Sequence, residues 1–385
     1  MRAALLEEAQ KPLALVEDVE IEAPRANEVV VAVSHCGICH SDLTMVDLPA
    51  GAPAPAVFGH EAAGVVEEVG SAVTRLAKGD KVMLTPLPSC GSCYFCVRGE
   101  FSLCVDAQSF MTGMRSDGTS PLSRGGQPVF QGFGLGGWGE YAVVHEGRAI
   151  RVPDDTPLEI VCVIGCAVQT GVGAVLNTAR VEEGATVLVT GLGGIGISIV
   201  QGARLANAAR VIVSDPVAER RDHAAHFGAT DILDPTRDDI VARTLELTGG
   251  VGVDYAFEGA GRSELITTGL QASRVGGTTV IVGAATEPLE LPMPAIFLSQ
   301  EKKLIGSLLG SCNGHRDVPR FLALWRKGAL DLESMISHRR PIADVNLGLE
   351  DMRAGRGLRT VLELQAPVQR TRGTGEALSS RPGRR

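Results

Sequence analysis

The chain has 385 residues, a length that suggests about two domains. Its hydrophobic content of 44% with 21% charged residues is ordinary for a soluble globular protein, and the net charge of −9 gives no support for nucleic-acid binding. No stretch approaches the roughly 18 apolar residues of a membrane span, and no signal-peptide pattern opens the chain. Nine cysteines, an odd number in clusters, favour a reducing cytosol over a disulfide scaffold, so we expect a cytoplasmic protein.

The N-terminal part is expected to be irregular and rich in β-structure. Short apolar runs alternate with Gly, Pro, Asn and Asp turns, which is typical of strands. The expected strands lie at residues 3–8, 13–22, 28–36, 59–70 and 78–86. Residues 105–139 are rich in Gly, Ser and Pro, and they predict a long loop of the length usually kept for function or assembly.

Four cysteines between these regions have the spacing C-x2-C-x2-C-x7-C: Cys90, Cys93, Cys96 and Cys104. Four thiolates can close a tetrahedral shell around one Zn²⁺ and leave no position for chemistry. Disulfides and an iron–sulfur cluster are the alternatives. The bacterial ferredoxin run has a final gap of about three residues and then a Pro, whereas here the gap is seven and Val105 follows. The spacing therefore predicts a structural zinc in a lobe at 90–104.

The character of the sequence changes near residue 160, where a buried helix is expected over 161–179. Apolar strands then alternate with helices, which indicates βαβ units and a parallel sheet. We expect strands at 185–191, 209–215, 253–259 and 277–283, with helices at 195–206, 219–228 and 265–273 between them. Two further helices, 318–330 and 347–355, precede a closing strand at 359–365.

Residues 366–385 lack apolar periodicity and carry five Arg. This composition predicts a disordered tail. Contact of the arginines with an anionic surface is the alternative, and a solvated terminus is favoured over it. The sequence shows no internal repeats.

A glycine-rich segment, Gly191-Leu192-Gly193-Gly194-Ile195-Gly196, follows the strand at 185–191 and opens a helix. This context is the one required of a dinucleotide fingerprint. Gly191 allows the tight turn, Gly193 lets the backbone approach a pyrophosphate, and Gly196 lets helix and strand pack closely. The helix N-terminus offers free N–H groups to phosphates. A glycine-rich turn without a ligand is the alternative.

Asp215 ends the next strand, 24 residues after Gly191. An acidic residue there can accept hydrogen bonds from the adenosine ribose and repel a 2′-phosphate, which favours NAD over NADP. An Asp at a strand end can also be only a turn former.

Cys39, His60 and Cys166 are the remaining candidates for a metal. Three such ligands with an open position describe a catalytic zinc. The residues lie far apart, so spacing does not prove the site. Cys36, three residues before Cys39, could form a metal or redox pair with it, and Cys162 could be only core.

In these motifs the chain resembles the zinc-containing medium-chain alcohol dehydrogenases over residues 1–364. The matching segments are Gly37-Ile38-Cys39-His40-Ser41-Asp42, Gly59-His60-Glu61, the cysteine quartet, Gly165-Cys166 and the fingerprint. The loop before Tyr141 looks like that of the longer, animal- and glutathione-type branch, whose members are typically homodimers. The resemblance implies an α/β fold with a Rossmann doubly wound parallel-sheet cofactor domain at 168–308. It also implies a β-rich GroES-like catalytic domain at 1–167 and 309–365.

The resemblance further implies the residues of the active site. Cys39, His60 and Cys166 match the catalytic zinc ligands, and Cys36 becomes a bystander. Glu61 matches an acid beside the zinc that can swing in as a ligand; a structural carboxylate is the alternative. Asp42 matches the partner of the ligand histidine, and Ser41 the hydroxyl that takes the alcohol proton. Without the resemblance, Ser41 and Asp42 would be only a helix N-cap pair.

The cofactor contacts are implied in the same way. His40 and Arg359 match residues on the pyrophosphate, Thr170 and Ile195 line the nicotinamide site, and Arg220 lies near the adenosine ribose. Thr44 departs from the pattern, because many members have there a histidine that ends the proton relay. Asn207 stands where a glycine is usual, and Asn tolerates the left-handed backbone that can end a helix.

The sequence thus predicts an NAD-dependent zinc alcohol dehydrogenase with two zinc ions per chain, acting on primary alcohols and aldehydes. The zinc would bind the alcohol oxygen and lower its pKa, and the cofactor would take the hydride. A thiol-adduct formaldehyde dehydrogenase and a nicotinoprotein with tightly held NAD are enzymatic alternatives. A non-catalytic nucleotide-binding scaffold is the alternative from another class. The substrate stays open, because Pro86 and Leu87 stand in a segment that varies greatly in the family.

Overall fold

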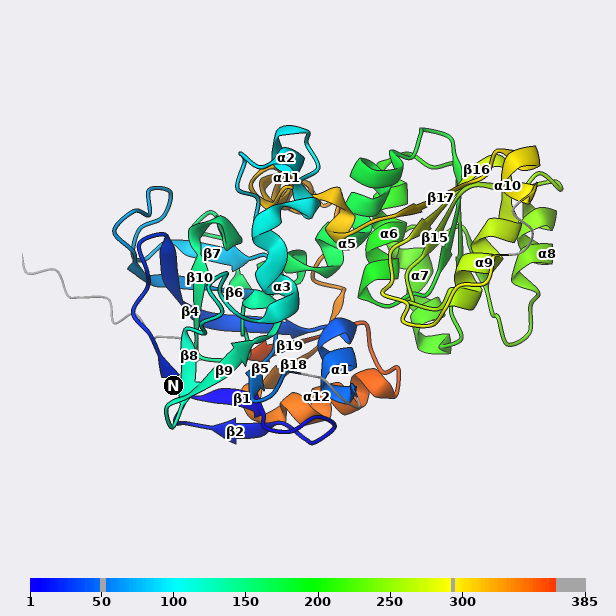
Figure 1. Cartoon of the computed structure of the whole chain (residues 1–385). Coiled ribbons are helices and arrows are strands. Elements are labelled where there is room, and N and C mark those ends of the chain that lie inside the picture. The colour runs from blue at the N-terminus through cyan, green and yellow to red at the C-terminus, as the bar shows by residue number, and fades with distance from the viewer. Residues whose placement is uncertain (49–52, 292–294, 365–385) are drawn as a thin grey trace, which may run out of the picture.

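The computed structural model describes residues 1–48, 53–291 and 295–364. They form a β-rich part, to the left in Figure 1, and a part built on one parallel sheet, to the right. The chain crosses from the first to the second through α5 (Ala167–Gly173) and returns after β17 (Lys303–Gly306). The tail predicted at 366–385 lies outside the described residues.

Two sheets build the β-rich part. The larger has the order β11-β7-β6-β4-β19-β18, with β10 also paired to β4, and the smaller has the order β2-β1-β5-β9-β8-β3. The eleven-residue strand β4 lies at the centre of the larger sheet, because its run of valines is buried on both faces. The strands are β1 (Ala3–Leu6), β2 (Ala14–Val16), β3 (Glu20–Ile21), β4 (Glu28–Ile38), β5 (Ala56–Val57), β6 (Glu61–Val69), β7 (Lys81–Leu84), β8 (Leu122–Arg124), β9 (Gln127–Gln131), β10 (Tyr141–His145), β11 (Ala149–Arg151), β18 (Ile336–Pro341) and β19 (Arg359–Glu363).

The second part is a doubly wound sheet with the parallel order β14-β13-β12-β15-β16-β17. Its strands are β12 (Thr186–Thr190), β13 (Arg210–Ser214), β14 (Asp231–Leu233), β15 (Val253–Glu258), β16 (Ser273–Ile281) and β17. Its helices are α6 (Gly194–Leu205), α7 (Ala218–Phe227), α8 (Ile240–Leu247), α9 (Ser263–Ala272) and α10 (Ala295–Gln300). The strand order reverses between β12 and β15, and ligands of such sheets bind at that point, outside the carboxyl ends of the strands. The predicted α/β fold with a Rossmann sheet and a β-rich domain is confirmed.

The remaining helices belong to the β-rich part or to the connection between the parts. They are α1 (His40–Asp47), α2 (Tyr94–Val97), α3 (Ser109–Thr112), α4 (Leu158–Val161), α5, α11 (Gly314–Arg326) and α12 (Val345–Arg353). The domain limits expected from the sequence are 168–308 for one domain and 1–167 with 309–365 for the other. All strands of the parallel sheet lie within 168–308, and all strands of the other two sheets lie outside that range.

The expectation of a long loop at 105–139 was wrong. The segment contains α3 and a β8–β9 hairpin, with Arg124 opposite Gln127 and Gly125-Gly126 as the two-residue turn. Both glycines have positive φ, +56° and +76°, which a type I′ hairpin turn requires. The Gly-Gly pair was the signal for this hairpin in the sequence.

The expected continuous helix at 161–179 is interrupted. The helical turn that ends at Gly165 and the helix that begins at Ala167 are bent by 54°, and Cys166 between them has φ −133° and ψ −69°. The break turns the cysteine out of the helix and toward the β-rich part. Within the described residues no single helix is long and apolar enough to cross a membrane. Only this bent pair meets the length and composition criteria together.

Candidate active site

Three elements bring the predicted trio together. Cys39 follows the end of β4, His60 directly precedes β6, and Cys166 stands at the helix break. All three are buried, and their candidate ligand atoms lie within 4.8 Å of one another. A tetrahedral zinc with bonds of about 2.3 Å to sulfur would separate two sulfurs by ~3.8 Å, and the Sγ atoms of Cys39 and Cys166 are 4.0 Å apart. The donor set and its spacing therefore fit a catalytic zinc.

Asp42 fixes the histidine of this trio. Its buried Oδ1 lies 2.9 Å from His60 Nδ1 and also accepts the Gly59 N–H at 3.0 Å. Its Oδ2 accepts the Cys39 N–H at 3.1 Å, where helix α1 begins. With Nδ1 bound to the carboxylate, Nε2 is left for the metal, which is the usual arrangement around a ligating histidine.

The electrostatics of the trio favour a thiolate at Cys39 but not at Cys166, whose pKa the hydrogen bond with Cys39 and burial raise well above its usual range. The hydrogen bond with Cys166 and the charge of Arg359 hold the pKa of Cys39 well below its usual range, against the effect of burial. Two hydroxyls flank the sulfurs: Ser41 Oγ lies 3.9 Å from Cys39 Sγ, and Thr170 Oγ1 lies 3.9 Å from Cys166 Sγ. The hydroxyl of Thr44 instead donates to the carbonyl of His40 at 2.9 Å, in its own helix.

Glu61 is buried next to the trio and pairs with Arg359. Its Oε1 lies 3.0 Å from Arg359 Nη2 and accepts the Ala167 N–H at 3.3 Å, while Oε2 has no hydrogen-bond partner among the described residues. Burial raises the pKa of Glu61 to about 8, although Arg359 acts in the opposite direction. Glu61 thus lies outside the group of ligand atoms formed by the trio.

A cavity of about 280 Å³ extends from Cys39 along the fingerprint to Asp215. It is lined by all the predicted cofactor contacts except Thr170 and Gly196: His40, Gly191, Gly193, Gly194, Ile195, Asp215, Arg220 and Arg359. A Cβ at Gly196 would lie 1.8 Å from the Gly191 carbonyl oxygen, so Gly196 serves the close packing of helix and strand. A Cβ at Gly194 would lie 2.7 Å from the guanidinium of Arg359, which therefore lies directly over the N-terminus of α6. Helix dipole and guanidinium together suit a pyrophosphate.

Asp215 supports the fingerprint turn from the end of β13. Its Oδ2 accepts the Leu192 N–H at 2.6 Å, and its Oδ1 accepts the Val217 N–H at 2.8 Å. Arg220 lies 3.8 Å from the same carboxylate. Asn207 has φ +55°, the left-handed conformation expected of it.

The cavity also contains residues that the sequence did not predict. They come mostly from the turn between α12 and β19: Met352, Arg353, Gly355, Arg356, Gly357, Leu358 and Thr360. The run Gly355-Arg356-Gly357-Leu358-Arg359, with two glycines around an arginine, was their only signal in the sequence.

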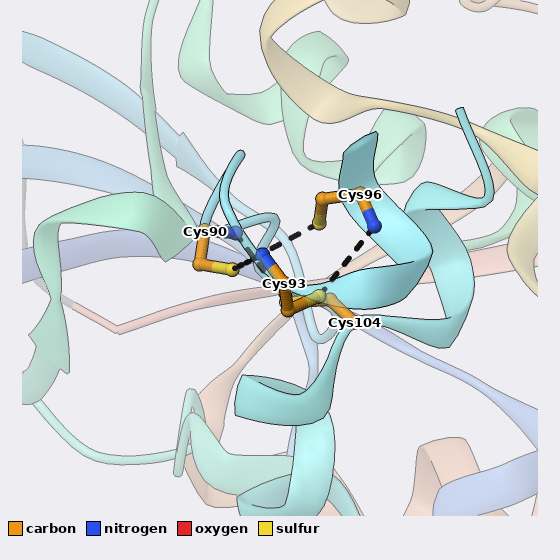
Figure 2. A group of neighbouring side chains, drawn as sticks. All are labelled: Cys90, Cys93, Cys96 and Cys104. Carbon is orange, nitrogen blue, oxygen red and sulfur yellow. Dashed lines mark hydrogen bonds between the residues drawn. The ribbon is translucent and has the colours of Figure 1, made fainter. Parts of the chain in front are cut away.

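The cysteine quartet forms a separate site. The sulfurs of Cys90, Cys93, Cys96 and Cys104 point toward one another (Figure 2) and lie within 4.8 Å. The Sγ atoms of Cys90 and Cys96 are 4.0 Å apart. Backbone N–H groups of Val105 and Cys96 lower the pKa of Cys93 to about 6, which favours the thiolate that a metal requires. The four sulfurs fit a closed structural zinc shell.

The side chains packed against the trio are apolar. Leu87 and Leu309 form a buried cluster with Cys39 and Cys166, and Ala107 and Phe110 pack against that cluster. The ring of Phe133 lies 4.5 Å from the His60 ring and 5.1 Å from the Phe110 ring, between centroids.

Comparison with known proteins identifies the class that this fold and site define. Residues 25–154 match the alcohol dehydrogenase GroES-like domain, and residues 194–327 match the zinc-binding dehydrogenase family. The chain belongs to the zinc-dependent alcohol dehydrogenase family, as its motifs indicated. It is an oxidoreductase acting on CH–OH groups, with zinc and NAD as cofactors.

Several relatives match over nearly the whole chain. An S-(hydroxymethyl)glutathione dehydrogenase of Saccharomyces cerevisiae is 34% identical, covering 94% of this chain and 95% of its own length. An NDMA-dependent alcohol dehydrogenase of Amycolatopsis methanolica is 36% identical over 94% of this chain and 98% of its own. The crystal structure of a benzyl alcohol dehydrogenase from Acinetobacter calcoaceticus superposes with a TM-score of 0.89 at 28% identity, covering 94% and 99%.

Proposed function

We propose that the chain oxidises apolar primary alcohols to aldehydes with NAD and catalyses the reverse reduction. The observation that carries this proposal is the apolar cluster around Cys39 and Cys166, formed with Leu87 and Leu309. The ring of Phe133, in contact with His60, extends the apolar surface. Such surroundings exclude water from the carbon chain of a substrate.

The chain's own residues then have defined tasks. When bound, the zinc acts as a Lewis acid and NAD accepts a hydride. Cys39, His60 and Cys166 would hold the metal, and Asp42 orients His60. Ser41, whose Oγ lies 3.9 Å from Cys39 Sγ, takes the hydroxyl proton. Because the Thr44 hydroxyl donates to its own helix, the proton leaves Ser41 toward the cofactor ribose and water.

The remaining assignments concern the cofactor. Gly194 and Arg359 take the pyrophosphate with His40, and Asp215 and Arg220 take the adenosine ribose. Gly191 and Gly193 let the backbone come close to the pyrophosphate, and Ile195 and Thr170 are assigned to the nicotinamide side. Glu61 is proposed as the acid that can join the zinc when its fourth position is free.

A thiol-adduct formaldehyde dehydrogenase is the second candidate. The names of the yeast relative and of one from Synechocystis, 37% identical, support it. The name of the Amycolatopsis relative supports the third candidate, an enzyme that uses an external acceptor in place of free NAD.

One assay separates these candidates. The purified protein would be given NAD with a series of primary alcohols that includes hexanol and benzyl alcohol, and separately with formaldehyde and glutathione. We expect NADH with the apolar alcohols. Activity confined to the glutathione adduct would favour the second candidate. Reduction of NDMA at the expense of an alcohol, without added NAD, would favour the third.

A pair of variants tests the apolar cluster. Leu87→Asn should lower kcat/KM for hexanol about tenfold, and the loss for ethanol should be smaller, since about one buried side chain's apolar contact is removed. The control is Leu15→Asn, at an exposed position of β2. An equal loss for both alcohols would count against substrate contact by Leu87.

We further propose that the protein is a cytoplasmic homodimer. The nine free cysteines support a reducing compartment. Strand β17 ends the parallel sheet with no further strand described beyond it, and Leu298, in the helix α10 that precedes this strand in the sequence, is 85% exposed. An unpaired strand edge with apolar neighbours is suited to a second copy. Light scattering should give twice the 40.3 kDa chain mass, and a monomer would contradict the proposal.

A further inference from the structure

The turn between α12 and β19 brings the β-rich part against the nucleotide sheet at one end of the cofactor cavity. Gly355 in this turn has φ +70°, and a Cβ placed on it would lie 3.2 Å from Val217 Cγ2 and 3.9 Å from Arg220 Nη2. Val217 and Arg220 follow β13, and Arg220 lines the same cavity. Two segments more than 130 positions apart in the sequence thus meet over this end.

Arg356, the next residue, lines the cavity and is held in place. Its Nε and Nη2 lie 2.8 and 2.7 Å from Oδ1 of Asp351. Asp351 is buried and also accepts a hydrogen bond from Arg340. Burial raises the pKa of this carboxyl, but the hydrogen bonds from the two arginines outweigh burial and leave the pKa below its usual range. Asp351 is therefore ionised, and it orients the guanidinium of Arg356, whose side chain is 55% exposed.

The end of the cavity at which Arg356 lies follows from its neighbours. Cys39 marks the nicotinamide side, and His40, Gly194 and Arg359 mark the pyrophosphate. A carboxylate after the second strand, here Asp215, marks the adenosine ribose. Since Gly355 lies close to Val217 and Arg220, and Arg356 and Arg220 line the same cavity, Arg356 lies at this adenosine end.

We propose that Arg356 is a cofactor-binding residue that contacts the adenosine half of NAD from the β-rich part, and that Asp351 is its positioning residue. The inference rests on the assignment of NAD to this cavity and not on the alcohol that is oxidised. Arg220 from one part and Arg356 from the other hold the same half of the cofactor. Release of NAD then requires that one of these contacts break first, so loss of Arg356 should speed release.

Binding of NAD and its two fragments tests the proposal without turnover. Calorimetry would compare NAD, 5′-AMP and nicotinamide mononucleotide on the zinc-loaded protein. Arg356→Ala should weaken NAD and 5′-AMP each about tenfold, the scale of one hydrogen bond from a charged group, and leave the mononucleotide unchanged. Stopped-flow NADH release should become faster by a similar factor.

The matched control is Arg326→Ala, an exposed arginine of α11 that pairs with Asp155 away from the cavity. It should change none of the three affinities. Unchanged 5′-AMP binding in Arg356→Ala, or equal losses for both fragments, would overturn the proposal, because the second result would place Arg356 at the pyrophosphate.

A double-mutant cycle tests the role of Asp351. Asp351→Asn should weaken 5′-AMP in the same direction as Arg356→Ala, and the double variant should bind it no worse than Arg356→Ala alone. Additive losses would show that Asp351 does not act through Arg356. The alcohol series given above is run on the wild-type protein, so failure of the substrate proposal would leave these fragment affinities intact.

Discussion

The carboxylate of Glu61 and the guanidinium of Arg359 form a buried ion pair at 3.0 Å that joins the metal site to the cofactor site. Glu61 follows His60, the proposed zinc ligand, and Arg359 covers the N-terminus of α6 at Gly194. Arg359 Nη1 also donates to the Ile38 carbonyl at 3.2 Å, directly before Cys39. Arg359 thus contacts the segments next to the proposed zinc ligands and also the helix N-terminus proposed to bind NAD.

Replacing Arg359 should therefore affect stability as well as NAD binding. At pH 9, above the Glu61 pKa of about 8, Arg359→Ala leaves the Glu61 carboxylate buried without its partner, which typically costs about 3–5 kcal/mol of unfolding free energy. Urea unfolding of the zinc-loaded protein measures this loss. The double variant Glu61→Gln/Arg359→Ala should recover part of it, because the neutral amide needs no counter-ion. A single variant as stable as wild type would contradict the buried pair.

Cys166→Ser should abolish turnover and leave the fold largely intact. Removing one ligand of the open site lowers zinc from two to one per chain, as metal analysis would show. Cys162→Ser is the matched control, because Cys162 is also buried, four residues earlier, but donates to the Glu159 carbonyl at 3.1 Å. It should keep both zinc ions and its activity.

Cys93→Ser should instead lower stability, because binding of a structural zinc contributes folding free energy. We expect a clear drop in Tm by calorimetry together with loss of one zinc per chain. Ser92→Ala, one residue earlier, keeps all four ligands and should melt like wild type. If Cys93→Ser and Cys166→Ser lost stability equally, the division between structural and catalytic sites would be refuted.

Asp215 has two separable tasks. Its charge repels a 2′-phosphate, and its oxygens hold the N–H groups of Leu192 and Val217. Asp215→Gly removes both, so NAD should bind more weakly and the kcat/KM ratio of NADP to NAD should rise. Asp215→Asn keeps acceptor oxygen for the turn and should raise the same ratio with a smaller loss for NAD. An unchanged ratio in both variants would remove Asp215 from cofactor choice.

His35 in β4 should make stability depend on pH. Burial lowers the pKa of its imidazole in the folded protein. As pH falls through about 6.5, the unfolded chain takes up this proton before the folded chain does, so stability present above that pH is lost below it. Tm measured from pH 7.5 to 5 should fall less steeply in His35→Asn than in wild type. The exposed His223→Asn should follow wild type, and equal slopes in all three proteins would exclude His35 as the cause.

Sites whose residues lie close together in the sequence could be predicted from the sequence, and sites formed by distant residues could not be derived from spacing alone. The quartet of Cys90 to Cys104 lies within one short lobe, so its spacing alone indicated a zinc shell. The fingerprint at Gly191 was equally local. Cys39, His60 and Cys166 come from three separate elements, and only the family resemblance connected them before the structure showed their atoms within 4.8 Å.

The misses have long-range causes. Hairpin β8–β9 was read as a loop because its strands complete a sheet with β3 and β5, which lie far away in the sequence. The helix break at Cys166 was missed because it places the cysteine beside Cys39 and His60, which lie more than 100 residues earlier in the sequence. Arg356 was missed because its turn approaches the nucleotide sheet only once β19 has joined β4.

The position of β19 has a consequence for biosynthesis. The strand is among the last described segments to leave the ribosome, yet it inserts between β4 and β18 in the larger sheet and carries Arg359. The parallel sheet, whose strands are contiguous in sequence, can form while translation continues, since domains generally fold as units. The β-rich part must wait for its final strand. A nascent chain that stops before residue 359 would therefore present an open β4 edge, and nucleotide binding of full strength would arise only after synthesis is nearly complete.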